Sequence, residues 1–248
     1  MERTVLITGC SSGIGKATAL AFLEEDWTVY ATARDEADLE DLEAEGCHTA
    51  ELDVTKPAQC RNVVEEVIEE TGRLDCLVNN AGYAQFGALE DVPPRRVHRQ
   101  FDVNVYGPHR LIRAALPHMR DAKSGTIVNV SSVAGRLSTP GMGVYSASKF
   151  ALEAMSDALR NEIDGFDVDV TVVVPGPVTT EFEERADAEL DPLDTTPAYE
   201  SLYEAYDDAR ALGDFGRAEP EAVADVILEA GTSTNPKSRY GVGPVAGY

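Results

Sequence analysis

Short apolar runs alternate with amphipathic segments along most of this 248-residue chain, and this alternation strongly constrains the fold. Runs typical of buried strands cover residues 4–8, 27–33, 49–54, 74–78, 126–130 and 168–174, and an edge strand is expected over 239–242. Residues 14–25, 38–45, 58–71, 144–163 and 220–230 have helical patterns. Continuous apolar strands separated by amphipathic helices indicate a mostly parallel sheet with helices on both faces. We therefore predict an α/β protein: one doubly wound domain over residues 1–248 with a seven-stranded sheet.

The charge of the chain is strongly acidic, with 44 Asp and Glu against 21 Lys and Arg and a formal net charge of -23. This balance argues against a nucleic-acid partner, which would require clustered basic residues. Only five of the basic residues are Lys. Scarce Lys with excess carboxylate favours a halophilic protein, because concentrated salt screens such self-repulsion. The alternative is an ordinary acidic cytosolic protein.

Cysteine usage and hydropathy indicate a cytoplasmic protein without a membrane span. The four Cys residues have no CxxC spacing, which argues against a zinc ribbon or a disulfide framework. No apolar run approaches the ~20 residues that a membrane span needs. The four His residues show no ligand spacing either, and no metal is expected. They are His48, His98, His109 and His118.

The segment 181–216 differs in composition from the rest of the chain. It is acidic and contains two Pro and scattered apolar residues, and it follows the sixth strand directly. Ligands in open α/β sheets bind at the carboxyl ends of the strands. We therefore predict a substrate lid over 181–216, with an acidic surface excursion or an oligomer contact as the alternatives.

A glycine-rich turn joins the first predicted strand to the first helix, with Gly9, Gly13 and Gly15 in GxxxGxG spacing. Such glycines allow the backbone to approach a phosphate, and the helix N-terminus presents free N–H groups to it. A glycine-rich turn alone is a weak signal, but its place between strand and helix is typical of a Rossmann dinucleotide site.

The end of the second strand indicates which dinucleotide is bound. Folds that prefer NAD place an acid there for the ribose 2′-hydroxyl, whereas this chain has Ala33 and Arg34, with Asp35 only afterwards. Because an Arg can pair with a 2′-phosphate, NADP(H) is favoured over NAD(H). The alternative is a surface Arg that balances nearby acids. Asp53 ends the third strand and could reach the adenine or cap a helix.

Four polar residues are candidates for catalysis. Tyr145 and Lys149 are four residues apart and share a helix face, Ser132 ends the fifth strand, and Asn104 lies in an otherwise apolar helical segment. A Tyr with a pKa of ~10 needs help to act near neutrality. We expect Lys149 to lower the pKa of Tyr145, and Ser132 to hydrogen-bond a substrate oxygen.

These residues together resemble the short-chain dehydrogenases/reductases with a TGxxxGxG turn and a YxxxK pair. The matching segments follow in order: Thr8 to Gly15, Asp53-Val54, Asn79 to Gly82, Asn104, Ser131-Ser132, Tyr145 to Lys149 and Pro175 to Thr180. Within the family, the chain is similar to the branch that includes 17β-hydroxysteroid dehydrogenase type 1 and retinol dehydrogenases. The resemblance covers nearly the whole chain except the segment 181–216 and the C-terminal tail.

The resemblance implies a role for each matching residue. Tyr145 is the acid/base, Lys149 lowers its pKa and binds the nicotinamide ribose, Ser132 holds the substrate oxygen, and Asn104 anchors a water in a proton relay. The implied cofactor-binding residues are Gly9, Ser11, Ser12, Gly13, Ile14, Gly15, Arg34, Asp53, Val54, Asn80, Ala81, Gly82, Tyr145, Lys149, Pro175, Gly176, Val178 and Thr180.

The expected activity is hydride transfer between NADP(H) and a small-molecule carbonyl or alcohol with an apolar body. Expected apolar walls of the pocket are Tyr83, Phe86, Leu137, Met142, Pro177, Phe182, Tyr199 and Tyr203. The family resemblance also implies a homodimer or homotetramer built through helices at about 97–118 and 148–161.

Three other functions remain open. The first is a non-enzymatic NADP(H)-binding sensor or regulatory subunit, and the second is a structural subunit. The third is an epimerase or dehydratase with bound NAD, against which Arg34 and the short C-terminal region argue.

Overall fold

A computed structural model of the protein describes residues 3–190, 193–211 and 217–243. Its strands form one seven-stranded sheet in the order β3-β2-β1-β4-β5-β6-β7, and every neighbouring pair is parallel. The predicted doubly wound fold is confirmed, and the sheet is wholly parallel where we predicted a mostly parallel one. The strands are β1 (Thr4–Thr8), β2 (Thr28–Ala33), β3 (His48–Glu51), β4 (Cys76–Asn79), β5 (Gly125–Val130), β6 (Val168–Pro175) and β7 (Arg239–Val242).

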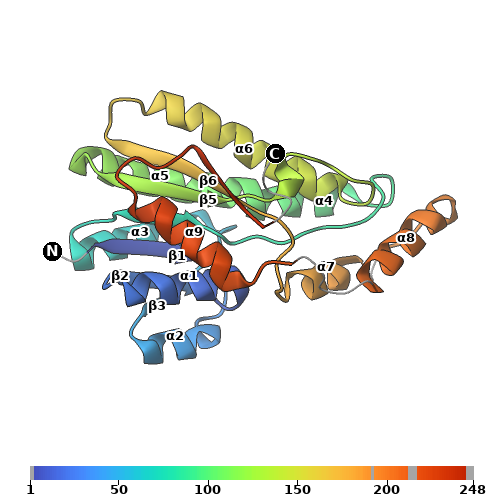
Figure 1. The fold of residues 1–248 in the computed structure, drawn as a ribbon, viewed down its shortest axis with the longest axis horizontal. Coiled ribbons are helices and arrows are strands. Elements are labelled where there is room, and N and C mark those ends of the chain that lie inside the picture. Colours follow the sequence, from blue (N-terminus) through green and yellow to red (C-terminus); the bar gives the residue numbers. More distant parts are fainter. Residues whose placement is uncertain (1–2, 191–192, 212–216, 244–248) are drawn as a thin grey trace.

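Helices connect the strands and cover both faces of the sheet (Figure 1). The α-helices are α1 (Gly13–Glu24), α2 (Glu40–Glu45), α3 (Pro57–Thr71), α4 (Pro94–Phe101), α5 (Gly107–Ala122), α6 (Gly143–Glu162), α7 (Phe182–Leu190), α8 (Glu200–Ala211) and α9 (Pro220–Thr232). Short 3-10 turns are η1 (Glu36–Leu39), η3 (Val133–Gly135) and η4 (Pro197–Tyr199), and η2 (Asp102–Tyr106) is a π-helical turn. Within the described residues, no helix is both long and apolar enough to cross a membrane.

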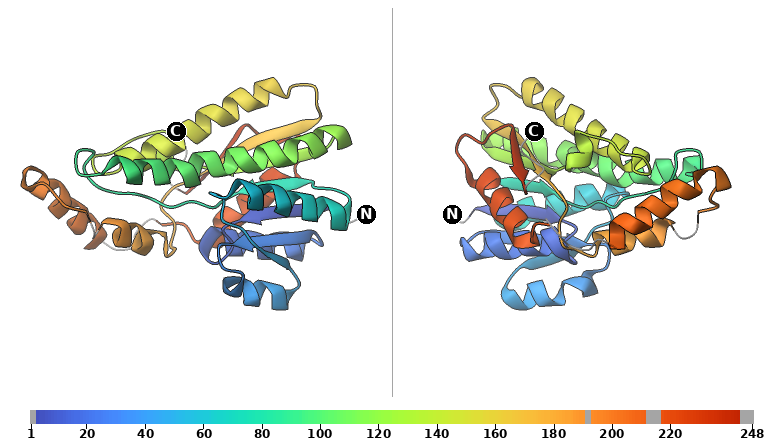
Figure 2. Two further views of the ribbon diagram at one scale, coloured as in Figure 1. Left: turned by 180° about the vertical axis from the view of Figure 1, so that it is seen from behind. Right: turned by 45° about the vertical axis from the view of Figure 1, so that its right-hand side comes forward.

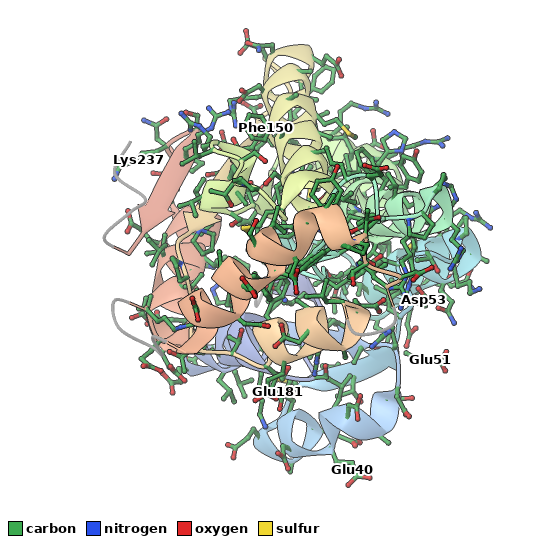
Figure 3. The ribbon with its side chains drawn as sticks, turned by 90° about the vertical axis from the view of Figure 1, so that its right-hand side faces the viewer. Glu40, Glu51, Asp53, Phe150, Glu181 and Lys237 are labelled. Atoms are coloured by element: carbon green, nitrogen blue, oxygen red, sulfur yellow. The ribbon has the colours of Figure 1, made fainter. Side chains whose placement is uncertain are left out.

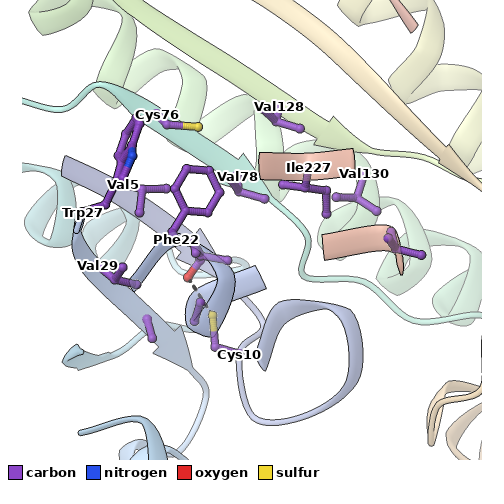
Figure 4. Close-up of a cluster of buried hydrophobic side chains, with 14 of the residues drawn as sticks. Val5, Cys10, Phe22, Trp27, Val29, Cys76, Val78, Val128, Val130 and Ile227 are labelled. Carbon is purple, nitrogen blue, oxygen red and sulfur yellow. Dashed lines mark hydrogen bonds between the residues drawn. The ribbon is translucent and has the colours of Figure 1, made fainter. Parts of the chain in front are cut away.

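Alternating strand residues supply two separate cores. Val5 and Ile7 of β1 face α1 and α9 and pack with Phe22 and Ile227 (Figure 4), whereas Leu6 faces the other way, toward α3 and α5. The alternation follows from the two-residue period of a strand. Both faces of the sheet are therefore buried, which explains why the strands read as continuous apolar runs rather than alternating ones.

The strand order reverses between β1 and β4, which places a crevice at the carboxyl ends of these two strands. In Figure 1, α7 and α8 extend from this end of the sheet, away from the N-terminus, and the views of Figure 2 agree. The predicted lid segment thus contains two helices that the sequence patterns did not reveal. Residues 191–192 and 212–216 of that segment lie outside the described residues.

Two strand predictions need correction. The third strand was expected over 49–54, but β3 ends at Glu51 because the Asp53 carboxylate accepts hydrogen bonds from both N and Oγ1 of Thr55 and turns the chain. The fourth was expected from residue 74, but pairing with β1 begins at Cys76.

Candidate active site

The glycine-rich turn runs from the end of β1 to the start of α1. Gly9 has a φ of +73°, and a Cβ on it would lie 2.9 Å from Cα of Ala81. A Cβ on Gly15 would lie only 2.1 Å from the Gly9 carbonyl oxygen. Side chains at these two positions would collide with backbone, so the turn takes this form only with glycine. The result is a bare stretch of backbone at the N-terminus of α1 that suits a pyrophosphate.

The carboxyl ends of β1 and β4 are tied together beside this turn. The Asn80 side-chain amide donates to the carbonyl oxygens of Thr8 and Gly9, at 2.9 and 3.1 Å. Thr8 Oγ1 accepts hydrogen bonds from the backbone N–H groups of Asn80 and Ala81. Asn80 therefore holds the floor of the crevice in place.

Arg34 and Asp35 take different positions at the end of β2. Arg34 lines the cavity at the switch point, whereas Asp35 does not. The Asp35 carboxylate instead accepts a hydrogen bond from the backbone N–H of Ala37 and caps η1. The basic residue, and not the acidic one, is thus available to a ligand here. Asp53 and Val54 also line the cavity.

Tyr145 and Lys149 lie on the buried face of α6. Each is 6% exposed, and Lys149 Nζ lies 5.9 Å from the centre of the Tyr145 ring. Lys149 Nζ donates a hydrogen bond to the Val130 carbonyl oxygen at the end of β5. Burial lowers the pKa of Lys149 from 10.5 to about 8, although Glu153 opposes this shift.

The expected lowering of the Tyr145 pKa is wrong for the protein alone. Burial raises the pKa of Tyr145 to about 12, and the Ser132 hydroxyl, which lowers it, only partly offsets burial. Lys149 directs its ammonium group to the Val130 carbonyl oxygen rather than to the phenol. The Tyr145 hydroxyl therefore carries its proton at neutral pH, as a proton donor must.

Ser132 follows β5 and caps η3. Its Oγ accepts a hydrogen bond from the backbone N–H of Ala134 at 3.1 Å, and this bond fixes the side chain. The Ser132 side chain also hydrogen-bonds Tyr145, so the two hydroxyl groups lie next to one another.

Asn104 is buried in the π-helical turn η2 and bridges two elements. Its Oδ1 accepts from the backbone N–H of Tyr83, and its Nδ2 donates to the Tyr83 carbonyl oxygen and to Ser148 Oγ. Ser148 Oγ in turn donates to the Tyr145 carbonyl oxygen at 2.6 Å. The Asn104 side chain thus ties the loop after β4 to the start of α6. Its role in a proton relay stays a prediction.

A cavity of about 520 Å³ joins these features at the carboxyl ends of the strands. Gly15 and Asn104 are not on its wall, whereas every other predicted site residue is. Those on the wall are Gly9, Ser11, Ser12, Gly13, Ile14, Arg34, Asp53, Val54, Asn80, Ala81, Gly82, Ser132, Tyr145, Lys149, Pro175, Gly176, Val178 and Thr180.

The reacting end of the cavity is largely aromatic. Phe86 and Phe182 flank the Tyr145 ring, with ring centres 6.2 and 5.7 Å away, and Tyr83, Met142 and Pro177 also line the wall. Three other expected wall residues lie elsewhere. Leu137 is 69% exposed, Tyr199 donates a hydrogen bond to Glu90, and Tyr203 donates one to Asp91.

Charged residues on the wall were missed from the sequence. Arg99 and Glu189 line the cavity and form an ion pair at 2.8 Å, and Arg96 holds the other oxygen of Glu189 at 3.0 Å. Arg185 of α7 lines it as well. The one available signal was that Arg185 is a rare base in the acidic segment 181–216.

Contacts on both sides hold the predicted lid segment against the body of the protein. Glu189 at the end of α7 forms ion pairs with Arg96 and Arg99 of α4. The Asp91 carboxylate accepts hydrogen bonds from Thr196 and Tyr203. Figure 3 views this end of the molecule, with α7 and α8 in front of the sheet and Glu181 labelled at the start of α7.

Comparison with known proteins identifies the family of this chain. A family model described as short chain dehydrogenase matches residues 3–191. The chain belongs to the short-chain dehydrogenase family. Within the described residues, this chain has no group of three or more His, Cys, Asp or Glu side chains that could hold a metal ion.

The matches to several curated relatives cover nearly the whole of this chain. The uncharacterized oxidoreductase YbbO of Escherichia coli K12 is 37% identical over 244 residues, which cover 98% of this chain and 86% of the relative. The NADPH-dependent 3-dehydrocapnine reductase of Ornithobacterium rhinotracheale is 34% identical (98% and 88%), and human retinol dehydrogenase 8 is 36% identical (96% and 80%).

Solved structures show the same fold. A short-chain dehydrogenase from Streptomyces avermitilis has a TM-score of 0.87 at 35% identity and covers 99% of this chain and 89% of its own. A serine dehydrogenase complexed with NADP+ has a TM-score of 0.85 at 27% identity (98% and 95%). A Burkholderia phymatum dehydrogenase in complex with NAD has a TM-score of 0.80 at 29% identity (92% and 85%). Relatives of this chain thus bind either dinucleotide.

Proposed function

We propose that this protein is an NADP(H)-dependent oxidoreductase acting on CH–OH groups, with Tyr145 as its acid/base. Its substrate is a carbonyl or alcohol compound with an apolar body. The observation that carries the proposal is the single cavity that joins the glycine-rich turn to Ser132, Tyr145 and Lys149. One end suits a dinucleotide, and the other presents a proton donor and a hydroxyl to a reacting oxygen.

The residues at the reacting end suit the reducing direction. Bound NADPH supplies the hydride for the carbonyl carbon. Tyr145 donates its hydroxyl proton to the carbonyl oxygen, and Ser132 holds that oxygen by a hydrogen bond. Lys149 offsets the negative charge that develops on the phenol as the proton leaves. The aromatic wall excludes water and strengthens these interactions.

The position of Arg34 supports NADP(H) over NAD(H). Arg34 lines the cavity after β2, and the acid that follows it in the chain, Asp35, caps η1. A guanidinium at this place suits a 2′-phosphate. The Burkholderia phymatum structure in complex with NAD shows that the fold alone does not select NADP(H).

The apolar wall supports a substrate with an apolar body. Phe86, Met142 and Phe182 belong to the apolar cluster that packs around the Tyr145 ring. Two relatives are named as a 3-dehydrocapnine reductase and a retinol dehydrogenase. We also propose that the segment 181–216 is the substrate lid, since Phe182 of α7 packs on Tyr145.

We further propose a cytoplasmic homo-oligomer. Exposed Tyr106 and Phe150 lie on the two helical segments that the family resemblance assigns to subunit contacts. The four Cys thiols are free and buried, which fits a reducing compartment. The formal net charge of -23 suits a salt-loaded cytoplasm.

The test is NADPH consumption, followed by absorbance, with a panel of ketones, aldehydes and quinones in molar KCl. Turnover with NADPH and at least tenfold weaker turnover with NADH are expected. Binding of NADPH without turnover on any compound would favour the sensor, and absence of dinucleotide binding would refute the proposal.

A further inference from the structure

An arginine of α7, a helix in the proposed lid segment 181–216, reaches the glycine-rich turn. Arg185 Nη2 of α7 donates a hydrogen bond to Ser12 Oγ at 3.2 Å, although the two residues are 173 positions apart. Arg185 lines the cavity together with Ser11, Ser12 and Gly13. Its side chain is half exposed, and a second bond joins it to Glu181 one turn earlier at 2.8 Å.

The place that Arg185 approaches is already electropositive. Ser12 is the N-cap of α1, but its side chain accepts no hydrogen bond from the amides of that helix. The first N–H groups of α1 therefore stay open, and the helix dipole places partial positive charge there. A guanidinium at this end of α1 adds like charge, and the Glu181 carboxylate that balances it is 60% exposed. An anion between the two would relieve the repulsion.

Other cations near the cavity have different partners or positions. Lys16 of α1 pairs with Asp41 and is not on the cavity wall. Arg99 pairs with Glu189, and Lys149 bonds the Val130 carbonyl oxygen at the reacting end. Arg34 follows β2, on the side where the 2′-phosphate is expected. Arg185 is thus the cation that the described structure brings to the phosphate-binding turn itself.

We propose that Arg185 binds the pyrophosphate of the dinucleotide and so fixes α7 over the reacting residues. This inference rests on the proposed function, because it takes the ligand of the cavity to be NADP(H). Contacts at the two ends of α7 explain how phosphate binding would fix this helix over the reacting residues. Phe182 contacts the Tyr145 ring at one end, and Glu189 forms ion pairs with Arg96 and Arg99 at the other. A phosphate bound at the middle of the helix would hold both contacts together.

Two arginine variants separate the phosphate groups of the ligand. Dissociation constants are measured by calorimetry for NADPH, NADH and 2′-AMP, which carries a 2′-phosphate but no pyrophosphate. Arg185→Gln is expected to raise the dissociation constants of NADPH and NADH by the same factor, about tenfold or more. The dissociation constant of 2′-AMP should not change. Arg34→Gln is the matched control. It is expected to weaken the binding of NADPH and 2′-AMP but not the binding of NADH. Arg185→Lys should recover part of the loss.

Three outcomes would overturn the inference. If Arg185→Gln changes the NADPH and NADH constants less than twofold, Arg185 is not a pyrophosphate ligand. If it weakens 2′-AMP equally, its effect is a general structural one. If the wild-type protein binds none of the three ligands, both the proposed function and the inference fail. In the first two outcomes the wild type still binds NADPH, so only the inference fails.

Hydrogen exchange tests the coupling to α7 without any turnover. Saturating NADPH should slow exchange of the backbone amides of α7 in the wild type, but not in Arg185→Gln at equal saturation. Equal slowing in both proteins would contradict the coupling.

Discussion

Replacing Lys149 by Met should stabilise the fold while it removes a residue assigned to the reaction. The Lys149 ammonium is buried in α6, and burial lowers its pKa from 10.5 to about 8. At about 1.4 kcal/mol per pKa unit, folding disfavours the charged form by about 3 kcal/mol at neutral pH. Loss of the hydrogen bond to the Val130 carbonyl oxygen reduces this gain in stability by about 1 kcal/mol. Lys149→Met should therefore raise the free energy of unfolding by about 2 kcal/mol at pH 7.

The pH dependence of this gain has a definite sign. The folded-state pKa of Lys149 lies below the unfolded value, so between about pH 8 and 10.5 the unfolded chain binds the extra proton. The contribution of Lys149 to wild-type stability therefore becomes less unfavourable as pH rises through this window. The advantage of Lys149→Met should be constant below about pH 8, shrink as the pH rises further, and be lost before about pH 10.5.

Urea unfolding followed by circular dichroism, at pH 7 and at pH 9.5 in molar KCl, measures both quantities. Lys56→Met is the matched control, because Lys56 is exposed and its removal changes the net charge equally. The control should change the free energy of unfolding by less than about 0.5 kcal/mol. A Lys149→Met protein that is less stable than wild type at pH 7, or whose gain is the same at both pH values, would refute the reasoning.

Three further predictions concern the cavity and its surroundings. Gly15→Ala should abolish NADPH binding and lower the free energy of unfolding by more than about 2 kcal/mol, since its Cβ would lie 2.1 Å from the Gly9 carbonyl oxygen; unchanged calorimetric binding would contradict this. Glu189→Ala should speed hydrogen exchange in α7 at least tenfold and change the free energy of unfolding by less than about 1 kcal/mol, because the ion pairs it loses are partly exposed. Unchanged exchange in α7 with a large loss of stability would show that these ion pairs support the whole fold. Molar KCl should raise the thermal midpoint relative to dilute buffer, because salt screens the net charge of -23; full structure and activity in dilute buffer with chelator would refute the halophilic hypothesis.

The strands and the order of the site residues could be predicted because they depend on local pattern. Val5, Leu6 and Ile7 form one continuous apolar run, since helices bury both faces of β1, and such a run identifies the strand without tertiary information. The glycine spacing after β1 likewise reflects a collision between nearby backbone atoms, which any chain with this turn must avoid.

Features that depend on long-range contacts could not be predicted. Val103-Asn104-Val105 reads as ordinary apolar helix, and the π-helical turn is evident only once Asn104 bonds Tyr83 and Ser148. Arg185 reaches Ser12 across 173 residues, and although a lone base stands out in the acidic α7, the sequence does not reveal its partner. The pKa of Tyr145 was predicted in the wrong direction because the spacing reveals neither the burial that raises it nor the hydrogen bond that directs the Lys149 ammonium to Val130.

The central claim, that Tyr145 is the proton donor of a carbonyl reductase, is tested most directly by comparing wild type with Tyr145→Phe. The rate of NADPH oxidation with the best carbonyl compound of the panel should fall at least a hundredfold, while the NADPH dissociation constant changes less than about twofold. A variant that keeps its turnover would contradict the assignment of Tyr145, whatever its affinity for NADPH.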